Sequence, residues 1–503
     1  MGNKKSLRKK YFFLNTVTSV FNQIILILSG FILPRAMLVS YGSEINGLVS
    51  SITQFLGFIS FLQAGVGVVI QVAWYKPLHE NNYQEISKIY KSAQDLFRKI
   101  ALIFLVYTFI LAFVYPTLVK TPFSNVYVTI LVFIISINLF SQYYFGLTNL
   151  LLLNADQKAY IPLAIQTVTL LLNLIVSAIL IYGRFPILVV QFISNMLNLL
   201  FPITMIFYVK NNYAIDRYIK YDNHTIKDKW SGFAQHISAV IVDNTDIVVL
   251  TVFSTLSNVS IYYVYYIVVN ALKLLLLSFT GGIQSLFGNM IVRKEIHQLK
   301  KLFLKFEIIF GYITTILYAS TLCLINSFVT VYTDGVNDVD FAQPAFSFLL
   351  TIAYAMFCYR TIYYTLIKAA GRFRETQFGA ILESILNIVI SILCVNNLGL
   401  VGVAIGTLVS VSYRTIYCVQ YLSSHLIYRE QRLFYKNIFL NVIIFVLSYV
   451  LTINLNLQSI SYLAWFMLAI QTFAIVAITA TVAYAVMYKK ELISLYKKMR
   501  MGA

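Results

Sequence analysis

The chain has 503 residues, of which 59% are hydrophobic and only 11% are charged, whereas an average globular chain carries about 25% charged residues. So few charged groups cannot cover a water-facing surface, which excludes a soluble globular protein. The formal net charge of +19 is explained by membrane topology, with some affinity for anionic lipid headgroups, rather than by nucleic-acid binding.

Apolar runs of about 17–25 residues, the length that crosses a bilayer as a helix, follow one another along the whole chain. The first run is too long for a cleaved signal peptide, and no small-residue cleavage site follows it. We therefore predict an all-α polytopic membrane protein with fourteen transmembrane helices, near 12–34, 46–72, 100–118, 125–148, 160–182, 187–208, 232–254, 259–288, 307–330, 344–367, 377–396, 401–422, 438–456 and 462–487.

The positive charges test this count. If the N-terminus is cytoplasmic and the helices alternate in direction, the eight inside segments hold 32 of the 38 Lys and Arg residues. Among short loops, those on the cytoplasmic side carry more Lys and Arg. A miscounted helix would invert the assigned side of every later loop, and the excess of positive charge inside would then be lost. The charges favour fourteen helices with both termini in the cytoplasm of a cell-membrane protein. The inside segments are 1–11, 73–99, 149–159, 209–231, 289–306, 368–376, 423–437 and 488–503.

An internal repeat appears when the chain is shifted by 214 residues. The shift places LLNLIVSAIL (171–180) over ILNIVISILC (385–394), and SEINGL (43–48) over SNVSIY (257–262). It carries six helices onto six, so the two repeats have the same orientation in the membrane. We predict two pseudo-symmetric six-helix lobes, 1–215 and 216–430, followed by two appended helices in 431–503. The matched polar pairs are Asn173 with Asn387 and Ser177 with Ser391.

Three stretches carry a family resemblance: YGSEINGLVSSITQFLGFISFLQAGVGVVIQ, DNTDIVVLTVF…VSIYYVYYIV and NNLGLVGVAIGT. With the six-six-two arrangement, they resemble the polysaccharide (lipid-linked oligosaccharide) flippases of the multidrug/oligosaccharidyl-lipid/polysaccharide exporter superfamily. The resemblance covers essentially the whole chain. It implies alternating access and a central cavity lined mainly by helices one, two, seven and eight. The implied substrate is a polyprenyl-diphosphate-linked oligosaccharide, moved from the inner to the outer leaflet for bacterial cell-surface polysaccharide biosynthesis.

Charged residues inside predicted spans are the candidate functional residues, because a charge in the hydrocarbon core costs about 2.5–3.5 kcal/mol unless it faces a partner or water. Asp243 and Asp246 could mark a turn or share one face of helix seven, and the apolar context favours the helix. They would then bind a coupling H⁺ or Na⁺, or balance the charge of Lys273 or His236. His236 is near the cytoplasmic end of that helix, where an interfacial packing role competes with a proton relay.

The remaining candidates are cations and one carboxylate. Lys273, Arg360 and Arg414 could contact the substrate diphosphate, although Arg360 and Arg414 could instead form a charge network with Glu383 inside the C-terminal lobe. Arg35, the fourth diphosphate candidate, flanks the first expected external connection together with Glu44, where interfacial anchoring is the alternative. We expect no catalytic residue, no bound metal and no cofactor beyond a coupling ion.

Two other functions compete with this interpretation. A multidrug exporter of the same superfamily is the nearer alternative, but such proteins normally have twelve helices. A membrane glycosyltransferase or polysaccharide polymerase would need catalytic groups at the membrane face, usually on a large external loop, and the longest external connection expected here is 331–343. Those enzymes are instead expected as partners in the same pathway, and no nucleic acid is expected to bind.

Overall fold

The computed structural model describes residues 2–63, 66–216, 218–221 and 233–489; the side chains of 2–10, 12, 68 and 233–236 lie outside this description. Within these ranges the regular secondary structure is helical, which confirms the all-α fold. Twelve helical segments of the described chain are long and apolar enough to cross a membrane. Since the first of them contains two rods and α10 (Phe233–Phe253) adds another, the described helices form the fourteen rods that the sequence predicts.

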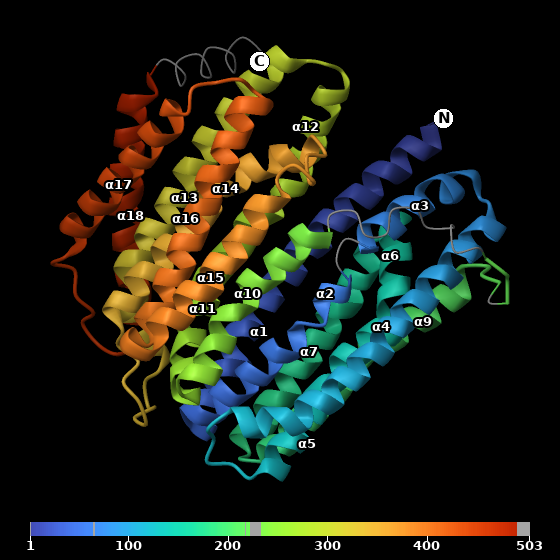
Figure 1. The fold of residues 1–503 in the computed structure, drawn as a ribbon, viewed down its shortest axis with the longest axis horizontal. Helices are drawn as coiled ribbons and strands as arrows, with labels where there is room; N and C mark the ends of the chain where they lie inside the picture. Colours follow the sequence, from blue (N-terminus) through green and yellow to red (C-terminus); the bar gives the residue numbers. More distant parts are fainter. Residues whose placement is uncertain (1, 64–65, 217, 222–232, 490–503) are drawn as a thin grey trace. The chain divides into compact units, whose positions relative to one another are not determined.

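The chain divides into two compact units, Met1–Ser260 and Ile261–Ala503, and the boundary falls inside α11. In each unit the helices form long rods (Figure 1). The predicted lobe boundaries of 1–215, 216–430 and 431–503 stay a prediction. Besides α10, the first unit contains α1 (Gly2–Gly57), α2 (Ser60–Gln63), α3 (Val66–Glu80), α4 (Tyr83–Leu118), α5 (Asn125–Ser141), the π-helical turn η1 (Gln142–Gly146), α6 (Leu147–Ala155), α7 (Tyr160–Tyr182), α8 (Ile187–Asn198) and α9 (Leu200–Asn212).

The second unit begins within α11 and ends with the two appended helices. In this unit α14 packs on α12, α13 and α16, while α13 also packs on both appended helices. Its elements are α11 (Leu256–Ser278), α12 (Thr280–Val292), α13 (Ile296–Tyr332), α14 (Pro344–Ala369), α15 (Gln377–Leu398), α16 (Leu400–His425), α17 (Arg432–Thr452) and α18 (Tyr462–Met487).

The expected external connection between the first two spans is not a loop. Helix α1 continues through it, and only Gly42 departs from helical geometry, with φ of 83° and ψ of 176°. A side chain at such a φ would be strained, so glycine allows the chain to change direction within one residue. The second span is also longer than expected, because it is broken into the end of α1, α2 and α3, and ends at Glu80.

Equivalent polar positions of the two repeats have equivalent structural roles. Asn173 is buried on α7 and its Nδ2 donates to Oδ1 of Asn198, 2.9 Å away at the end of α8. Asn387 is buried on α15 and its Nδ2 lies 3.3 Å from Oγ1 of Thr407 on the following helix. In both lobes a buried asparagine thus joins one helix to the next, as expected for pseudo-symmetric repeats.

The α15–α16 pair approaches closely because the facing residues are small. A Cβ added to Gly402 would lie 2.5 Å from the carbonyl oxygen of Cys394, and one added to Gly406 would lie 2.2 Å from Oγ of Ser391. Small residues four positions apart let membrane helices pack backbone to backbone. This explains the GVAIGT stretch at the start of α16 by packing.

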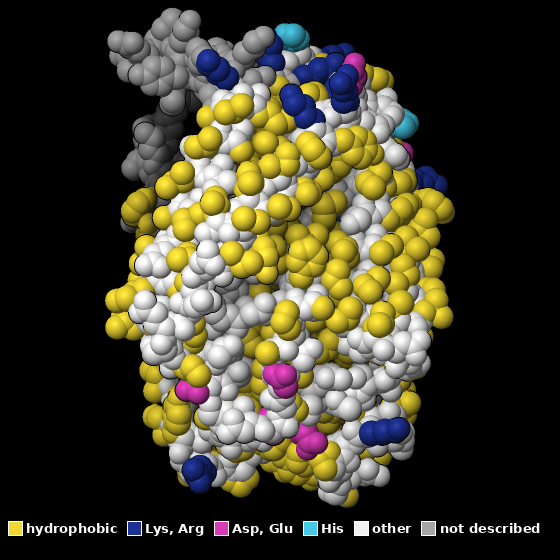
Figure 2. All heavy atoms as spheres, turned by 90° about the vertical axis from the view of Figure 1, so that its left-hand side faces the viewer, with side chains coloured by type: hydrophobic (Ala, Val, Ile, Leu, Met, Phe, Trp, Pro, Cys, Tyr) yellow, Lys and Arg dark blue, Asp and Glu magenta, His cyan; other side chains and the backbone are white. Residues whose placement is uncertain are grey.

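The surface has the polarity of a membrane protein. Many large apolar side chains are exposed, including Phe439 on α17 (68%) and Ile478 on α18 (65%). Figure 2 shows one face with a broad hydrophobic band; most Lys and Arg side chains gather at one end, and the other end carries several acidic side chains and fewer basic ones. This distribution matches an apolar belt with positive charges on one side of the bilayer.

Candidate functional site

Asp243 and Asp246 both lie within α10, so the stretch between them is helical and not a turn. Their surroundings nevertheless differ: Asp246 is 4% exposed, whereas Asp243 is exposed. Helix α10 packs against α1, and a Cβ added to Gly57 of α1 would lie 3.2 Å from Oδ1 of the neighbouring Asn244. The two aspartates therefore differ in their exposure although they lie on one helix.

Lys273 is buried on α11, with 5% of its surface exposed. Its Nζ lies 4.8 Å from the ring centroid of Phe357 and 5.6 Å from that of Tyr354, both on α14. A desolvated ammonium over aromatic faces gains about 2 kcal/mol from cation–π attraction. The aromatic rings therefore stabilise a positive charge within an otherwise apolar helix, where burial disfavours it.

Arg360, Glu383 and Arg414 lie together although they come from α14, α15 and α16. Nη1 of Arg360 is 2.6 Å from Oε1 of Glu383, and Nε of Arg414 is 3.7 Å from Oε2 of the same carboxylate. Nη1 of Arg414 also donates to the carbonyl oxygen of Thr376 at 2.8 Å. All three charged side chains are buried. The arrangement is a charge network inside the second unit, with two cations around one anion.

The other two candidates are not brought into this network. Arg35 is half-buried on α1, seven residues before the bend at Gly42. His236 belongs to the first turn of α10, and its side chain lies outside the described residues.

A second buried ion pair was not among the sequence candidates. Glu307 of α13 is 5% exposed, and its two carboxylate oxygens each lie 2.6 Å from a guanidinium nitrogen of Arg429. The hydroxyl of Tyr363 on α14 also donates to Glu307. Burial lowers the pKa of Arg429, but the contact with Glu307 raises it, and the net direction is upward. The signal in the sequence was a lone carboxylate at the first position of a predicted span.

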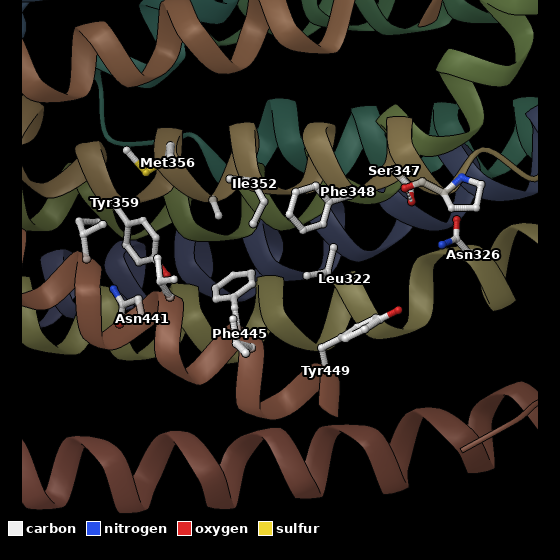
Figure 3. A pocket seen from close by; sticks show the side chains of 15 residues that line it. Leu322, Asn326, Ser347, Phe348, Ile352, Met356, Tyr359, Asn441, Phe445 and Tyr449 are labelled. Atoms are coloured by element: carbon white, nitrogen blue, oxygen red, sulfur yellow. Dashed lines mark hydrogen bonds between the residues drawn. The ribbon is translucent and has the colours of Figure 1, made fainter. Parts of the chain in front are cut away.

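An apolar cavity of about 580 Å³ lies in the second unit between α13, α14 and α17 (Figure 3). Two asparagines, Asn326 and Asn441, lie near its opposite ends, while the wall between them is almost entirely hydrophobic. On α14 the lining runs from Pro344 to Tyr359, which at 1.5 Å rise per residue corresponds to about 22 Å. The cavity therefore has the polarity and the length to take an extended hydrocarbon chain.

The described residues contain no group of three or more His, Cys, Asp or Glu side chains that could hold a metal ion. What the second unit does provide is a buried cation, a charge network and a long apolar cavity.

The sequence matches no known family profile and no curated protein. Solved structures do match. A lipid II flippase, MurJ, in an inward closed conformation aligns with a TM-score of 0.72 and 14% identity, covering 95% of this chain and 100% of that one. The MATE multidrug transporter DinF-BH aligns with a TM-score of 0.63 and 14% identity, covering 83% and 97%. A transporter of the MOP superfamily from Pyrococcus furiosus aligns with a TM-score of 0.58 and 11% identity, covering 83% and 96%. The chain thus has the fold of the MOP-superfamily flippases and transporters.

Proposed function

We propose that this protein is a flippase that moves a polyprenyl-diphosphate-linked oligosaccharide from the inner to the outer leaflet of a bacterial cell membrane by alternating access. The product would supply cell-surface polysaccharide synthesis, with a polymerase and glycosyltransferases acting before and after it. In this proposal both termini lie in the cytoplasm, and the protein itself performs no covalent chemistry.

The observation that carries this proposal is the apolar cavity between α13, α14 and α17. A drug transporter with twelve helices would lack its α17 wall, whereas a lipid substrate needs a place for its long tail. The fold comparison agrees, since the lipid II flippase aligns over all of its own length and over 95% of this chain. The drug transporter DinF-BH leaves 17% of this chain unmatched, about the share that residues 431–503 occupy.

To move the diphosphate headgroup, the protein has to supply cations and no covalent catalysis. Moving a diphosphate with two negative charges outward is favoured by about 4–5 kcal/mol at a potential of 100 mV, negative inside. The protein then has to lower the barrier, which requires a hydrated cationic path for the head. Lys273 is the described cation that we assign to this path, because it is buried on α11 beside the rings of Tyr354 and Phe357. Arg360 and Arg414 already surround Glu383, so we assign them to structure.

The second candidate is a multidrug exporter, favoured by the MATE transporter structures that share the fold. The two functions are separated by reconstituting the full-length protein in proteoliposomes and measuring two activities. One is the flipping of a polyprenyl-diphosphate sugar, and the other is the transport of a cationic dye. We expect flipping of the lipid without transport of the dye. Dye transport without lipid flipping would replace our proposal by the exporter.

The cavity offers a matched pair of variants for the same assay. Val446 and Val450 are one turn apart on α17 and are equally exposed (56% and 57%), but only Val446 lines the cavity. We expect Val446→Trp to fill part of the cavity and slow flipping at least threefold, and Val450→Trp to leave flipping near the parental rate. Equal effects of the two variants would remove the cavity from the mechanism.

A further inference from the structure

A second, charged hollow lies where α12 ends and α13 begins. It has a volume of about 780 Å³ and is formed by one helix hairpin of the second unit. In the predicted topology this hairpin is at the cytoplasmic face, because it contains the inside segment 289–306. The hollow is lined by Leu286, Asn289, Met290, Arg293, Glu295, Gln298, Lys301, Leu302 and Lys305.

The charge of this hollow is unbalanced. Arg293, Lys301 and Lys305 face a single carboxylate, Glu295, and within the described part of the chain none of the three cations forms an ion pair. Lys301 and Lys305 are four residues apart on α13, a spacing at which like charges repel and destabilise a helix. Folding therefore gains nothing from this arrangement, but an anion placed between the cations would stabilise it.

An apolar hollow of about 360 Å³ continues from the charged one along α12, α13 and the end of α11. The two hollows share Leu286, and from Lys301 to Ile313 the groove follows α13 for about 18 Å. Its walls are apolar and partly open, with Phe279 60% exposed and Ile309 45% exposed. At Gly282 an added Cβ would meet no atom within 4 Å, so this part of the groove is empty space. The lining comprises Leu276, Phe279, Gly282, Ile283, Leu286, Phe306, Ile309, Phe310 and Ile313.

We propose that this continuous groove is a binding site for an anionic glycerophospholipid of the inner leaflet. The phosphate lies among Arg293, Lys301 and Lys305, and an acyl chain follows the apolar hollow past Gly282 toward Ile313. Basic pockets between membrane helices at the cytoplasmic face recognise anionic headgroups in this way. The order of the groove, cations at the membrane face and hydrocarbon walls at greater depth, matches a phospholipid already standing in that leaflet. The site is separate from the cavity of α13, α14 and α17 and does not depend on what the protein transports.

The charged hollow, which is proposed to bind the phosphate, is tested by measuring how much phosphatidylglycerol the purified full-length protein retains. Native mass spectrometry and titration in detergent provide the measurement. Lys301→Gln combined with Lys305→Gln should weaken binding roughly twenty-fivefold, at roughly fivefold for each cation lost. The matched control combines Lys294→Gln with Lys300→Gln, which removes the same charge from the same hairpin at residues that do not line the hollow. The control should change binding less than threefold. An equal loss of phosphatidylglycerol affinity in the two double variants would mean that the lipid is attracted by the net charge of the hairpin, and would overturn the site.

The apolar hollow, which is proposed to bind the acyl chain, is tested by a second pair of variants. Gly282→Leu should fill the apolar hollow and weaken binding of phosphatidylglycerol, whereas Gly281→Leu adds the same side chain on the same helix, also in open space but outside the lining. Both variants should fold, because neither new Cβ meets an atom within 4 Å. Equal binding by these two variants would remove the apolar hollow from the site.

The ligand chemistry is tested with three competitors. Phosphatidylcholine and free glycerol phosphate should each compete at least tenfold less well than phosphatidylglycerol, because one lacks net charge and the other lacks the chain. Stronger competition by undecaprenyl diphosphate than by phosphatidylglycerol would assign the groove to a different lipid and overturn our proposal, while leaving the proposed flippase function standing.

Discussion

Asn46 of α1 donates a hydrogen bond from Nδ2 to Oγ of Ser260 on α11, 2.8 Å away, and the two residues are 214 positions apart. Ser43 and Ser257 form a hydrogen bond of 3.1 Å with the same separation. This separation is the offset of the internal repeat, so residues at equivalent positions of the two repeats contact each other directly. Such self-pairing is expected where two pseudo-symmetric segments meet at their local axis.

The first prediction concerns the close approach beside this pair. A Cβ at Gly47 would lie 1.9 Å from the carbonyl oxygen of Leu256, a backbone atom that cannot move aside. We expect Gly47→Ala to lower the apparent Tm of the purified protein by more than about 5 °C, or to prevent its accumulation. Gly30→Ala is the control, because it lies on the same helix and its Cβ would meet nothing within 4 Å. Equal stability of the two variants would contradict the contact.

The second prediction concerns the network around Glu383. Arg360 is its nearer partner, at 2.6 Å, and both side chains are buried. Removing one member of a buried ion pair costs about 3–5 kcal/mol, because the other charge is left without compensation. We therefore expect Arg360→Met and Glu383→Gln to destabilise the protein separately and the double variant to lose less than the sum. Thermal unfolding across this double-mutant cycle measures the coupling, and simple additivity would argue against the network.

The third prediction concerns Arg429, in the connection between α16 and α17. Its two contacts of 2.6 Å to Glu307 anchor this connection to α13. Arg429→Gln should destabilise the protein by about 3–5 kcal/mol, because it leaves Glu307 buried and unbalanced. Arg432→Gln removes the same charge three residues later, at an exposed position, and should change stability by less than about 0.5 kcal/mol. Limited proteolysis between α16 and α17 and thermal unfolding both report the difference.

The fourth prediction separates the two aspartates of α10. Asp246 is buried and Asp243 is exposed, so a protonation or Na⁺ switch should depend on Asp246. In proteoliposomes with pH, Na⁺ and voltage gradients imposed one at a time, we expect Asp246→Asn to change the dependence of flipping on one gradient. Asp243→Asn should keep the parental dependence. If both variants flip like the parent under every gradient, the aspartates only balance charge.

A fifth prediction concerns loading of the anionic head. Lys273→Gln should weaken binding of a polyprenyl diphosphate at least fivefold, because it removes the buried cation under the rings of Tyr354 and Phe357. Lys273→Arg should restore part of the binding, since it keeps the charge. A Lys273→Gln protein with parental affinity would move the headgroup site elsewhere.

The sequence by itself determined the number of rods, the class of protein and the repeat, because hydrophobic length and the sidedness of charge are local properties of a chain in a bilayer. The sequence also identified Asp246, Lys273 and Glu383 as candidate functional residues, because a charged residue within an apolar run is rare. Only the tertiary structure decided which charges meet: Glu307 and Arg429 are 122 residues apart, and nothing in either neighbourhood specifies the other. The same holds for Asp243 and Asp246, where helical spacing predicted a shared face but the tertiary packing buried only Asp246. The cavity and the groove were likewise decided by tertiary structure, because a hollow is bounded by several helices and depends on which side chains fail to fill the space between them.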